Sequence, residues 1–243
     1  MRIGIGITTR NRPDMLRVSV VHQLAFKPAE AEFVVVEDCS DKPYGKALSE
    51  QLGAQYILNG CRQGISKSKN LCIKALDGCD WVFLFDDDCF PRHAGWSYAF
   101  IRAAEINDVH HLMYLEEHGI VTPYRPVGTG LVAFYQCQGC MLLFSRKALD
   151  VLGGYDSRFW HYGFEHAQIS NRAFKARLSP EKYLTIADAT RYIFSMDISY
   201  AKDNRLPIGS LLAPFGSEQS CDDKDQCNRN VTIFNDTTIR REI

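Results

Sequence analysis

Short apolar runs separated by polar segments recur along the first 90 residues of the chain. Residues 2–8 alternate isoleucine with glycine, while residues 33–36 and 81–85 are apolar without a break, and each run ends in polar or acidic residues. Unbroken apolar runs of this kind are typical of strands that are covered on both faces. The pattern predicts three buried strands, and residues 56–58 are a weaker fourth candidate.

Helical spacing occupies the stretches between these runs. Pro13 stands where a helix can begin, and Leu16, Val20 and Leu24 follow at intervals of about one helical turn. Ser66 is a candidate N-cap for a second helix. Besides the helix at Pro13, three further helices are expected, over residues 66–76, 96–105 and 165–176.

Alternating strands and helices predict an α/β fold with a Rossmann-like, mostly parallel sheet flanked by helices. Residues 133–144 add two strand segments interrupted at Gly139. Right-handed crossovers bring the carboxyl ends of parallel strands to one edge of the sheet, where ligands bind in open α/β sheets. We therefore expect three polar clusters to line a single cleft, at residues 8–12, 37–38 and 86–88.

The end of the chain differs in composition from the rest. Beyond Asp203 the apolar periodicity weakens, and prolines and glycines precede a polar stretch over residues 217–229. This composition is typical of loops and tails rather than of a second core. We expect one domain over residues 1–202 and a C-terminal extension over residues 203–243 that closes over a bound ligand as a lid.

Composition narrows the classes of partner. Of the 243 residues, 46% are hydrophobic and the formal net charge is −1 at pH 7. The chain can therefore bury a continuous core, but it has no global positive field for binding a nucleic acid. No transmembrane segment of about 18 apolar residues occurs, and no apolar leader follows Met1. We expect a soluble, cytoplasmic protein whose nine cysteines are mostly buried and reduced.

Three consecutive aspartates, Asp86, Asp87 and Asp88, follow the apolar run at residues 81–85. Hard divalent cations take oxygen ligands, and Mg²⁺ or Mn²⁺ held by one or two carboxylates completes its coordination with water and substrate phosphates. The cluster therefore predicts a metal site for a phosphate-bearing ligand. A solvated acidic turn is the alternative.

Basic residues occupy loops and helix starts near the same predicted edge, where backbone N–H groups also favour anions. They are Arg10, Arg12, Arg62, Lys67 and Lys69. Each of them alone is more often a solvated surface charge. Neither common phosphate-binding glycine loop occurs, because the glycines of residues 4–6 lie within the first strand and the later glycine is missing.

Glu165 and His166 follow an aromatic stretch, residues 159–164, at the predicted start of a helix. Aromatic rings can stack on a sugar, and a carboxylate or imidazole beside them can accept a hydroxyl proton. The alternative is that the aromatics belong to the core and that Glu165 complements the helix dipole. Cys137 and Cys140 have the spacing of zinc ligands, but no second pair or spaced histidines complete a zinc site.

Five segments taken together resemble the family 2 glycosyltransferases, enzymes with the GT-A fold. The segments keep the family's order and spacing over most of residues 1–178: residues 5–13, 34–38, 64–70, 83–88 and 153–165 running into Arg172. The resemblance implies a metal-dependent transfer of a sugar from a nucleotide diphosphate sugar, with UDP favoured, to a hydroxyl acceptor such as a glycan. It also implies a role in polysaccharide biosynthesis.

The resemblance further implies roles for individual residues. The positions that match nucleotide-sugar-binding residues are Thr8, Arg10, Arg12, Glu37, Asp38, Lys69, Asn70, Asp86 and Asp87. Asp86 and Asp88 match the Asp-x-Asp motif, whose second aspartate usually ligates the metal, Mn²⁺ or Mg²⁺. Glu165 and His166 match the Gly-x-Glu-Asp motif, in which the last acid commonly serves as the catalytic base of inverting members.

The chain departs from this last motif, because His166 stands where the family has aspartate. A neutral histidine can act as a base, Glu165 can take over, or His166 can serve as a metal ligand. We expect Glu165 as the base of an inverting single displacement and His166 as the second candidate. Two alternatives remain: a catalytically inactive domain that binds a sugar nucleotide or glycan, and a sugar nucleotidyltransferase, which is expected to carry a glycine-rich basic loop after its first strand.

Overall fold

The computed structural model describes residues 1–118, 121–160, 163–196, 230 and 233–234 of the chain. These residues form eleven strands: β1 Ile3–Thr9, β2 Glu32–Glu37, β3 Gln55–Leu58, β4 Trp81–Asp86, β5 Cys89–Pro91, β6 His111–Met113, β7 Pro123–Val127, β8 Leu131–Phe134, β9 Met141–Ser145, β10 Leu184–Ile186 and β11 Ile193–Ser195. They also form seven helices: α1 Pro13–Phe26, α2 Gly45–Leu52, α3 Ile65–Ala75, α4 Trp96–Ile106, α5 Arg146–Leu152, α6 Glu165–Lys175 and α7 Ala189–Tyr192. The lid predicted over residues 203–243 falls almost entirely outside the described residues.

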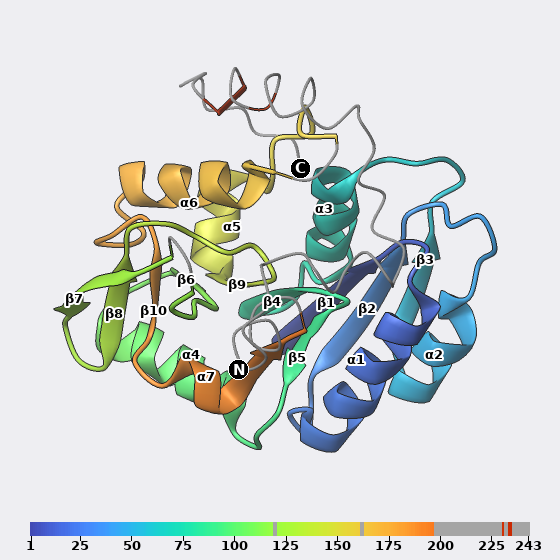
Figure 1. The fold of residues 1–243 in the computed structure, drawn as a ribbon, viewed down its shortest axis with the longest axis horizontal. Helices are drawn as coiled ribbons and strands as arrows, with labels where there is room; N and C mark the ends of the chain where they lie inside the picture. The colour runs from blue at the N-terminus through green and yellow to red at the C-terminus, as the bar shows by residue number, and fades with distance from the viewer. Residues whose placement is uncertain (119–120, 161–162, 197–229, 231–232, 235–243) are drawn as a thin grey trace.

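A six-stranded sheet with the order β3-β2-β1-β4-β9-β6 forms the centre of the molecule (Figure 1). Its first four strands are parallel, and β9 pairs antiparallel with both β4 and β6. A three-stranded antiparallel sheet, β10-β8-β7, and a two-stranded pair, β11-β5, complete the fold. The predicted α/β architecture with a mostly parallel sheet is confirmed.

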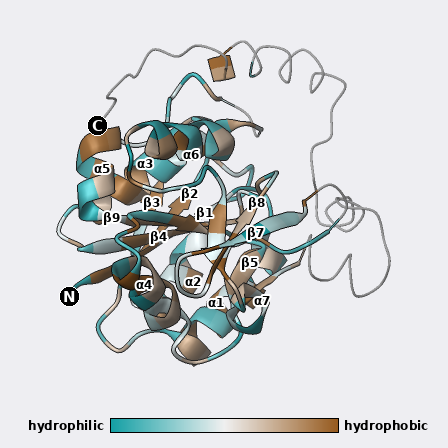
Figure 2. Cartoon of the chain, turned by 90° about the vertical axis from the view of Figure 1, so that its left-hand side faces the viewer, coloured by the Kyte–Doolittle hydropathy of each residue, from teal (hydrophilic) through white to brown (hydrophobic). Residues whose placement is uncertain are grey.

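Separate sets of helices cover the two faces of the central sheet. α1, α2 and α4 pack on the face that carries Ile5 and Ile7, and α3, α5 and α6 pack on the opposite face (Figure 1). The glycines that alternate with these isoleucines let α3 approach closely, because a Cβ at Gly6 would lie only 2.6 Å from the Cβ of Cys72. The central strands are accordingly coloured mostly as hydrophobic, whereas the helices around them carry both colours (Figure 2).

One local expectation is wrong, and another is confirmed with an unexpected arrangement. Ser66 does not cap α3; the N-cap is Gly64, whose φ of 84° suits glycine, and Ser66 is buried in the first helical turn. The two strand segments within residues 133–144 exist, but they belong to different sheets, because residues 135–140 carry the chain from β8 in the outer sheet to β9 in the central one. The predicted starts of α1, α4 and α6 are confirmed.

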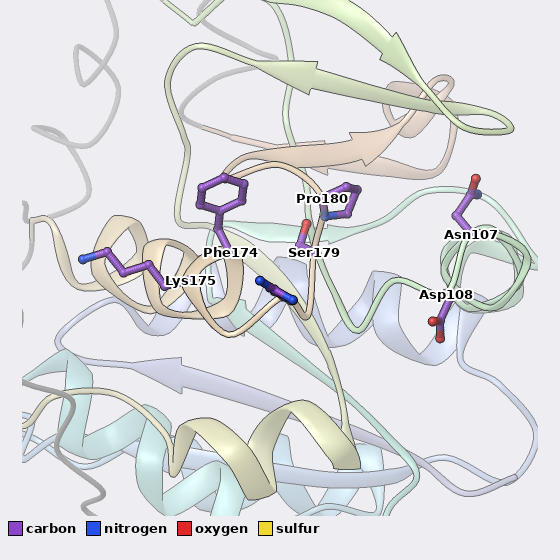
Figure 3. A pocket seen from close by; sticks show the side chains of 7 residues that line it. Asn107, Asp108, Phe174, Lys175, Ser179 and Pro180 are labelled. Carbon is purple, nitrogen blue, oxygen red and sulfur yellow. The ribbon is translucent and has the colours of Figure 1, made fainter.

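An open hollow lies near the amino-terminal edge of the central sheet (Figure 3). Its lining residues are Asn107, Asp108, Phe174, Lys175, Arg177, Ser179 and Pro180. Asn107 and Asp108 lie just before β6, whose first residue, His111, pairs with Phe144. Because Phe144 in turn pairs with Val82 near the start of β4, the hollow is remote from Asp86 at the other end of β4.

None of the helices in the described part of the chain is long and apolar enough to cross a membrane.

A histidine is buried within the central sheet. The His111 ring stacks on Phe144 with centroids 4.4 Å apart, and its Nδ1 lies 3.0 Å from the carbonyl oxygen of Leu143. Burial lowers the pKa of His111 from 6.5 to about 4, although the Leu143 carbonyl opposes the shift. His111 is therefore neutral in the folded protein at neutral pH.

This burial is expected to make the fold sensitive to mild acid. Between pH 6.5 and about 4, His111 takes up a proton in the unfolded chain but not in the folded one, so stability falls as the pH drops. The loss reaches about 3 kcal/mol below both pKa values. Urea denaturation of wild type and His111→Gln across this range measures it, and the variant is expected to show a flatter pH profile. Parallel profiles would contradict the assignment.

Candidate active site

The ends of three neighbouring parallel strands bring the predicted polar clusters to one edge of the sheet. Thr8 of β1 lies opposite Asp86 of β4, and Thr9 lies opposite Glu37 of β2. The loop after β1 and the acidic residues that end β2 and β4 therefore meet. This part of the sequence prediction is confirmed.

A fully buried lysine on α3 faces the first aspartate of the cluster. Lys69 Nζ lies 3.0 Å from Asp86 Oδ1 and donates to the carbonyl oxygen of Gly139, 3.2 Å away. Burial opposes the charged form of Lys69, but the Asp86 carboxylate outweighs it and raises the pKa of the lysine. Lys69 is thus a buried counter-charge to Asp86 and not a solvated surface charge.

Removing this counter-charge is expected to destabilise the fold. Lys69→Met leaves the Asp86 carboxylate without its partner, and breaking a buried ion pair from one side costs about 3 kcal/mol or more. Urea denaturation measures the loss, and the double variant with Asp86→Asn is expected to recover much of it. Lys67→Met, at an exposed position on the same helix, is the matched control and is expected to change stability by less than about 0.5 kcal/mol. Equal effects of the two lysine variants would contradict the role of Lys69.

The middle aspartate joins the loop after β1 to the end of β4. Asp87 is fully buried, accepts a hydrogen bond of 2.5 Å from the Thr9 hydroxyl and forms an ion pair with Arg12. The same guanidinium contacts Asp88 Oδ2 at 3.0 Å. Burial raises the pKa of Asp87 to about 7, against the opposing charge of Arg12. The contacts of Asp87 and Arg12 therefore connect the loop after β1 with the end of β4.

Asp86 and Asp88 have the donor chemistry that a divalent cation requires. Asp86 uses Oδ1 for Lys69 and Thr8, and Asp88 uses Oδ2 for Arg12, so each carboxylate retains one oxygen without a partner among the described residues. Burial and the charge of Asp88 raise the pKa of Asp86, while Lys69 acts in the opposite direction. Two carboxylates that repel each other fit Mg²⁺ or Mn²⁺, which bind one or two carboxylates and complete their coordination with phosphate oxygens.

His166 does not join these aspartates. Within the described ranges no three His, Cys, Asp or Glu side chains are placed to hold a metal ion, so the set Asp86, Asp88 and His166 is not assembled there. His166 Nδ1 instead lies 3.1 Å from Glu165 Oε1. Burial opposes a charge on His166, but Glu165 outweighs it and raises the pKa of His166 well above its ordinary value. An imidazolium ion has no lone pair to give a metal.

Glu165 is buried at the first position of α6. Its Oε2 accepts a hydrogen bond of 2.8 Å from the backbone N–H of Gly163. Burial works against its charge, but the His166 side chain outweighs burial and lowers the pKa of Glu165 to about 2. Glu165 is therefore ionised at neutral pH, and it lies close enough to Lys69 and Asp86 for the charges to interact.

Two other predicted site residues, Glu37 and Asp38, each accept a hydrogen bond from a backbone N–H at the start of a helix. Glu37 is fully buried and accepts a 2.8 Å hydrogen bond from the backbone N–H of Gly45, the first residue of α2. Asp38 accepts one of 2.8 Å from the backbone N–H of Gly64, the N-cap of α3. Both carboxylates thereby shape the loops that border the sheet edge.

Asn70, another predicted site residue, forms hydrogen bonds with the backbone. The Asn70 amide bonds both the N–H and the carbonyl oxygen of Tyr155, which ties α3 to the segment before α6. Arg10 follows β1 at the same edge of the sheet.

Gly139 borders the site although it is not among the predicted site residues. A Cβ at this position would lie 2.5 Å from His166 Nδ1, so the close approach of His166 requires glycine. Its interruption of an apolar run is the sequence feature that could have indicated it.

Comparisons with known proteins identify the chain. The model for glycosyl transferase family 2 matches residues 5–114, and that for the N-terminal domain of galactosyltransferase matches residues 130–196. An uncharacterized glycosyltransferase of Acanthamoeba polyphaga mimivirus is 27% identical over 208 residues, which cover 79% of this chain and 80% of the relative. Both models and the relative are glycosyltransferases, so the chain is a glycosyltransferase, and over residues 5–114 it is similar to family 2.

Solved structures resemble this glycosyltransferase at low sequence identity. GalNAc-T7 with UDP, GalNAc and Mn²⁺ has a TM-score of 0.63 and 15% identity, over 77% of this chain and 42% of that one. S. aureus TarS has a TM-score of 0.56 and 13% identity, over 96% of this chain and 80% of that one. The mannosyltransferase PcManGT of Pyrobaculum calidifontis with GDP-Man and Mn²⁺ has a TM-score of 0.52 and 14% identity, over 70% of this chain and 51% of that one. The predicted GT-A fold is confirmed, and the glycosyltransferase spans about half or less of the GalNAc-T7 and PcManGT chains.

Proposed function

We propose that this glycosyltransferase moves a sugar from a nucleotide diphosphate sugar, UDP-linked in preference, to a hydroxyl group of a glycan with inversion at the anomeric carbon. The observation that carries the proposal is the meeting of Asp86, Asp88 and Lys69 with the ionised Glu165 at one sheet edge. GalNAc-T7 and PcManGT, which share the fold, hold UDP and GDP-Man with Mn²⁺, and this supports the choice of donor and metal.

The aspartate cluster forms the donor end of the proposed site. Asp86 and Asp88 would hold Mn²⁺ or Mg²⁺, which when bound neutralises the diphosphate and makes it a better leaving group. Three carboxylates meet two cationic side chains, Lys69 and Arg12, so the cluster carries one excess negative charge when all are ionised. That excess favours a divalent cation and disfavours a diphosphate without one.

Glu165 forms the acceptor end. As the acceptor oxygen bonds to the anomeric carbon, the bond from that carbon to the diphosphate breaks and the hydroxyl proton passes to the Glu165 carboxylate. The raised pKa of His166 supports Glu165 rather than His166 as the base, because a protonated imidazole cannot accept a proton. In this assignment His166 orients Glu165 through their 3.1 Å contact.

A glycan acceptor is supported by an aromatic side chain close to Glu165 in sequence. Trp160 is 44% exposed, and the Arg62 guanidinium lies 5.2 Å from its ring centroid. A large ring with an adjacent hydrogen-bond donor suits the apolar face and hydroxyl groups of a sugar. Polysaccharide biosynthesis and a cytoplasmic location remain predictions from the sequence.

A product assay tests the proposal. The protein is incubated with a panel of nucleotide sugars, oligosaccharide acceptors and Mn²⁺, and nucleoside diphosphate release is measured while NMR identifies the anomer formed. The expected result is acceptor-dependent release with an inverted product. Release of pyrophosphate from a nucleoside triphosphate and a sugar phosphate would instead indicate the nucleotidyltransferase, and nucleotide binding without turnover would indicate the inactive binding domain.

A further inference from the structure

Asn230, which follows β11 in the chain, contacts the turn that precedes Glu165. Asn230 lies outside both matched family regions, the second of which ends at residue 196, yet it is fully buried. Its Nδ2 donates a 3.0 Å hydrogen bond to the carbonyl oxygen of Gly163. Phe234, four residues further on, packs its ring on that of Phe164 with centroids 5.6 Å apart.

The turn that receives these contacts has an unfavourable backbone conformation. Gly163 and Phe164 have φ values of 108° and 68°. Positive φ is readily adopted by glycine but is an outlier for a bulky residue such as phenylalanine, so the surrounding structure must hold the turn in place. The hydrogen bond from Asn230 and the packing of Phe234 are two such restraints, and both come from the C-terminal segment.

The same turn fixes the proposed base. The N–H of Gly163 donates to Glu165 Oε2 at 2.8 Å, while the carbonyl of Gly163 accepts from Asn230. Both backbone polar groups of one residue are thus engaged, one by the carboxylate and the other by the amide. A shift of this residue would therefore displace the carboxylate, and small displacements of a reacting group lower rates steeply.

We propose that Asn230 is a positioning residue for Glu165 and acts through the backbone of Gly163. This inference rests on the proposed function, in which Glu165 accepts the acceptor's proton. Asn230 is then part of the active site, although it follows the last described strand by more than 30 residues. Because a carbonyl oxygen only accepts hydrogen bonds, the role requires an N–H donor at position 230.

Asn230→Asp tests this requirement, since aspartate has the same shape without the amide donor. We expect kcat to fall about tenfold, the effect of one well-placed hydrogen bond, with the donor KM changed less than about twofold. The melting temperature is expected to fall as well, because the new carboxylate is buried and faces a carbonyl oxygen, so kcat is measured well below it. Asn107→Asp is the matched control: the Asn107 amide also donates to backbone carbonyls, those of Ala103 and Thr129, but near the opposite edge of the sheet, and this variant is expected to leave kcat unchanged within about twofold. An unchanged kcat in Asn230→Asp would overturn the proposal.

Two further measurements separate positioning from a general structural role. In a Glu165→Gln background, Asn230→Asp is expected to reduce kcat by less than about twofold more, because the base it positions is already gone; full multiplication of the two losses would contradict the proposal. Amide hydrogen exchange at Gly163 reports on the turn directly and can be measured without an activity assay. Asn230→Asp is expected to accelerate it severalfold, and unchanged exchange would overturn the positioning role even if the proposed transferase reaction itself failed.

Discussion

Asp88→Asn is expected to lower the rate of sugar transfer on the order of a thousandfold. Asp88 contacts Arg12 through Oδ2 alone, which leaves its other oxygen without a partner among the described residues. Asparagine keeps the shape and can still contact its surroundings, but it removes the charge that would hold the metal ion. The loss of several kcal/mol of electrostatic stabilisation at the leaving group therefore appears in the rate.

The comparison with another aspartate isolates this effect. Asp77→Asn changes an exposed carboxylate that pairs with Arg146 at 3.2 Å, and it is expected to leave transfer unchanged within about twofold, since exposed ion pairs contribute little. Thermal unfolding of both variants checks that Asp88→Asn is folded. Normal transfer by folded Asp88→Asn, or an equal loss in Asp77→Asn, would rule out the proposed metal ligand.

Glu165→Gln is expected to reduce kcat by about 10²–10⁴-fold, the usual contribution of a positioned general base. Glutamine retains an oxygen that can accept from Gly163 but cannot take up the acceptor's proton. Donor binding depends on the aspartate cluster at the other end of the site, so the affinity for nucleotide and metal is expected to change less than about threefold. Steady-state kinetics with calorimetric nucleotide binding separates the two effects.

His166→Gln is the companion variant for this assignment. If His166 only orients Glu165, its replacement is expected to cost less than the loss of Glu165 itself. The reverse order, with Glu165→Gln nearly active and His166→Gln inactive, would transfer the role of base to His166. The ion pair between the two residues makes their effects non-additive, so both single variants and the double variant are needed.

The fold was largely predictable because its main strands are long apolar runs. β1, β2 and β4 each contain at least four consecutive buried positions, and such runs have few alternatives to a sheet covered on both faces. By contrast, β5, β6, β10 and β11 have only three residues each. Strands this short carry no periodicity and exist through pairing with distant partners, which a local pattern does not reveal.

The site was predictable only as far as topology determines it. The ends of parallel strands must meet, so the sequence could place Thr8 beside Asp86. It could not show that Lys69 is fully buried, because helical spacing gives the face of a residue but not the depth to which the helix packs. The contact of Asn230 with Gly163 spans 67 positions in the sequence and has no local pattern at all.

Calorimetric titration of the wild-type protein with UDP, GDP, dTDP and CMP, in the presence of Mn²⁺ and again with EDTA, tests the central claim most directly. The expected result is Mn²⁺-dependent binding of one nucleoside diphosphate, UDP in preference, that disappears with EDTA and in Asp88→Asn. Binding of none of the nucleotides under any condition, or binding that is equally strong with EDTA, would contradict a metal-assisted nucleotide-sugar site at Asp86 and Asp88.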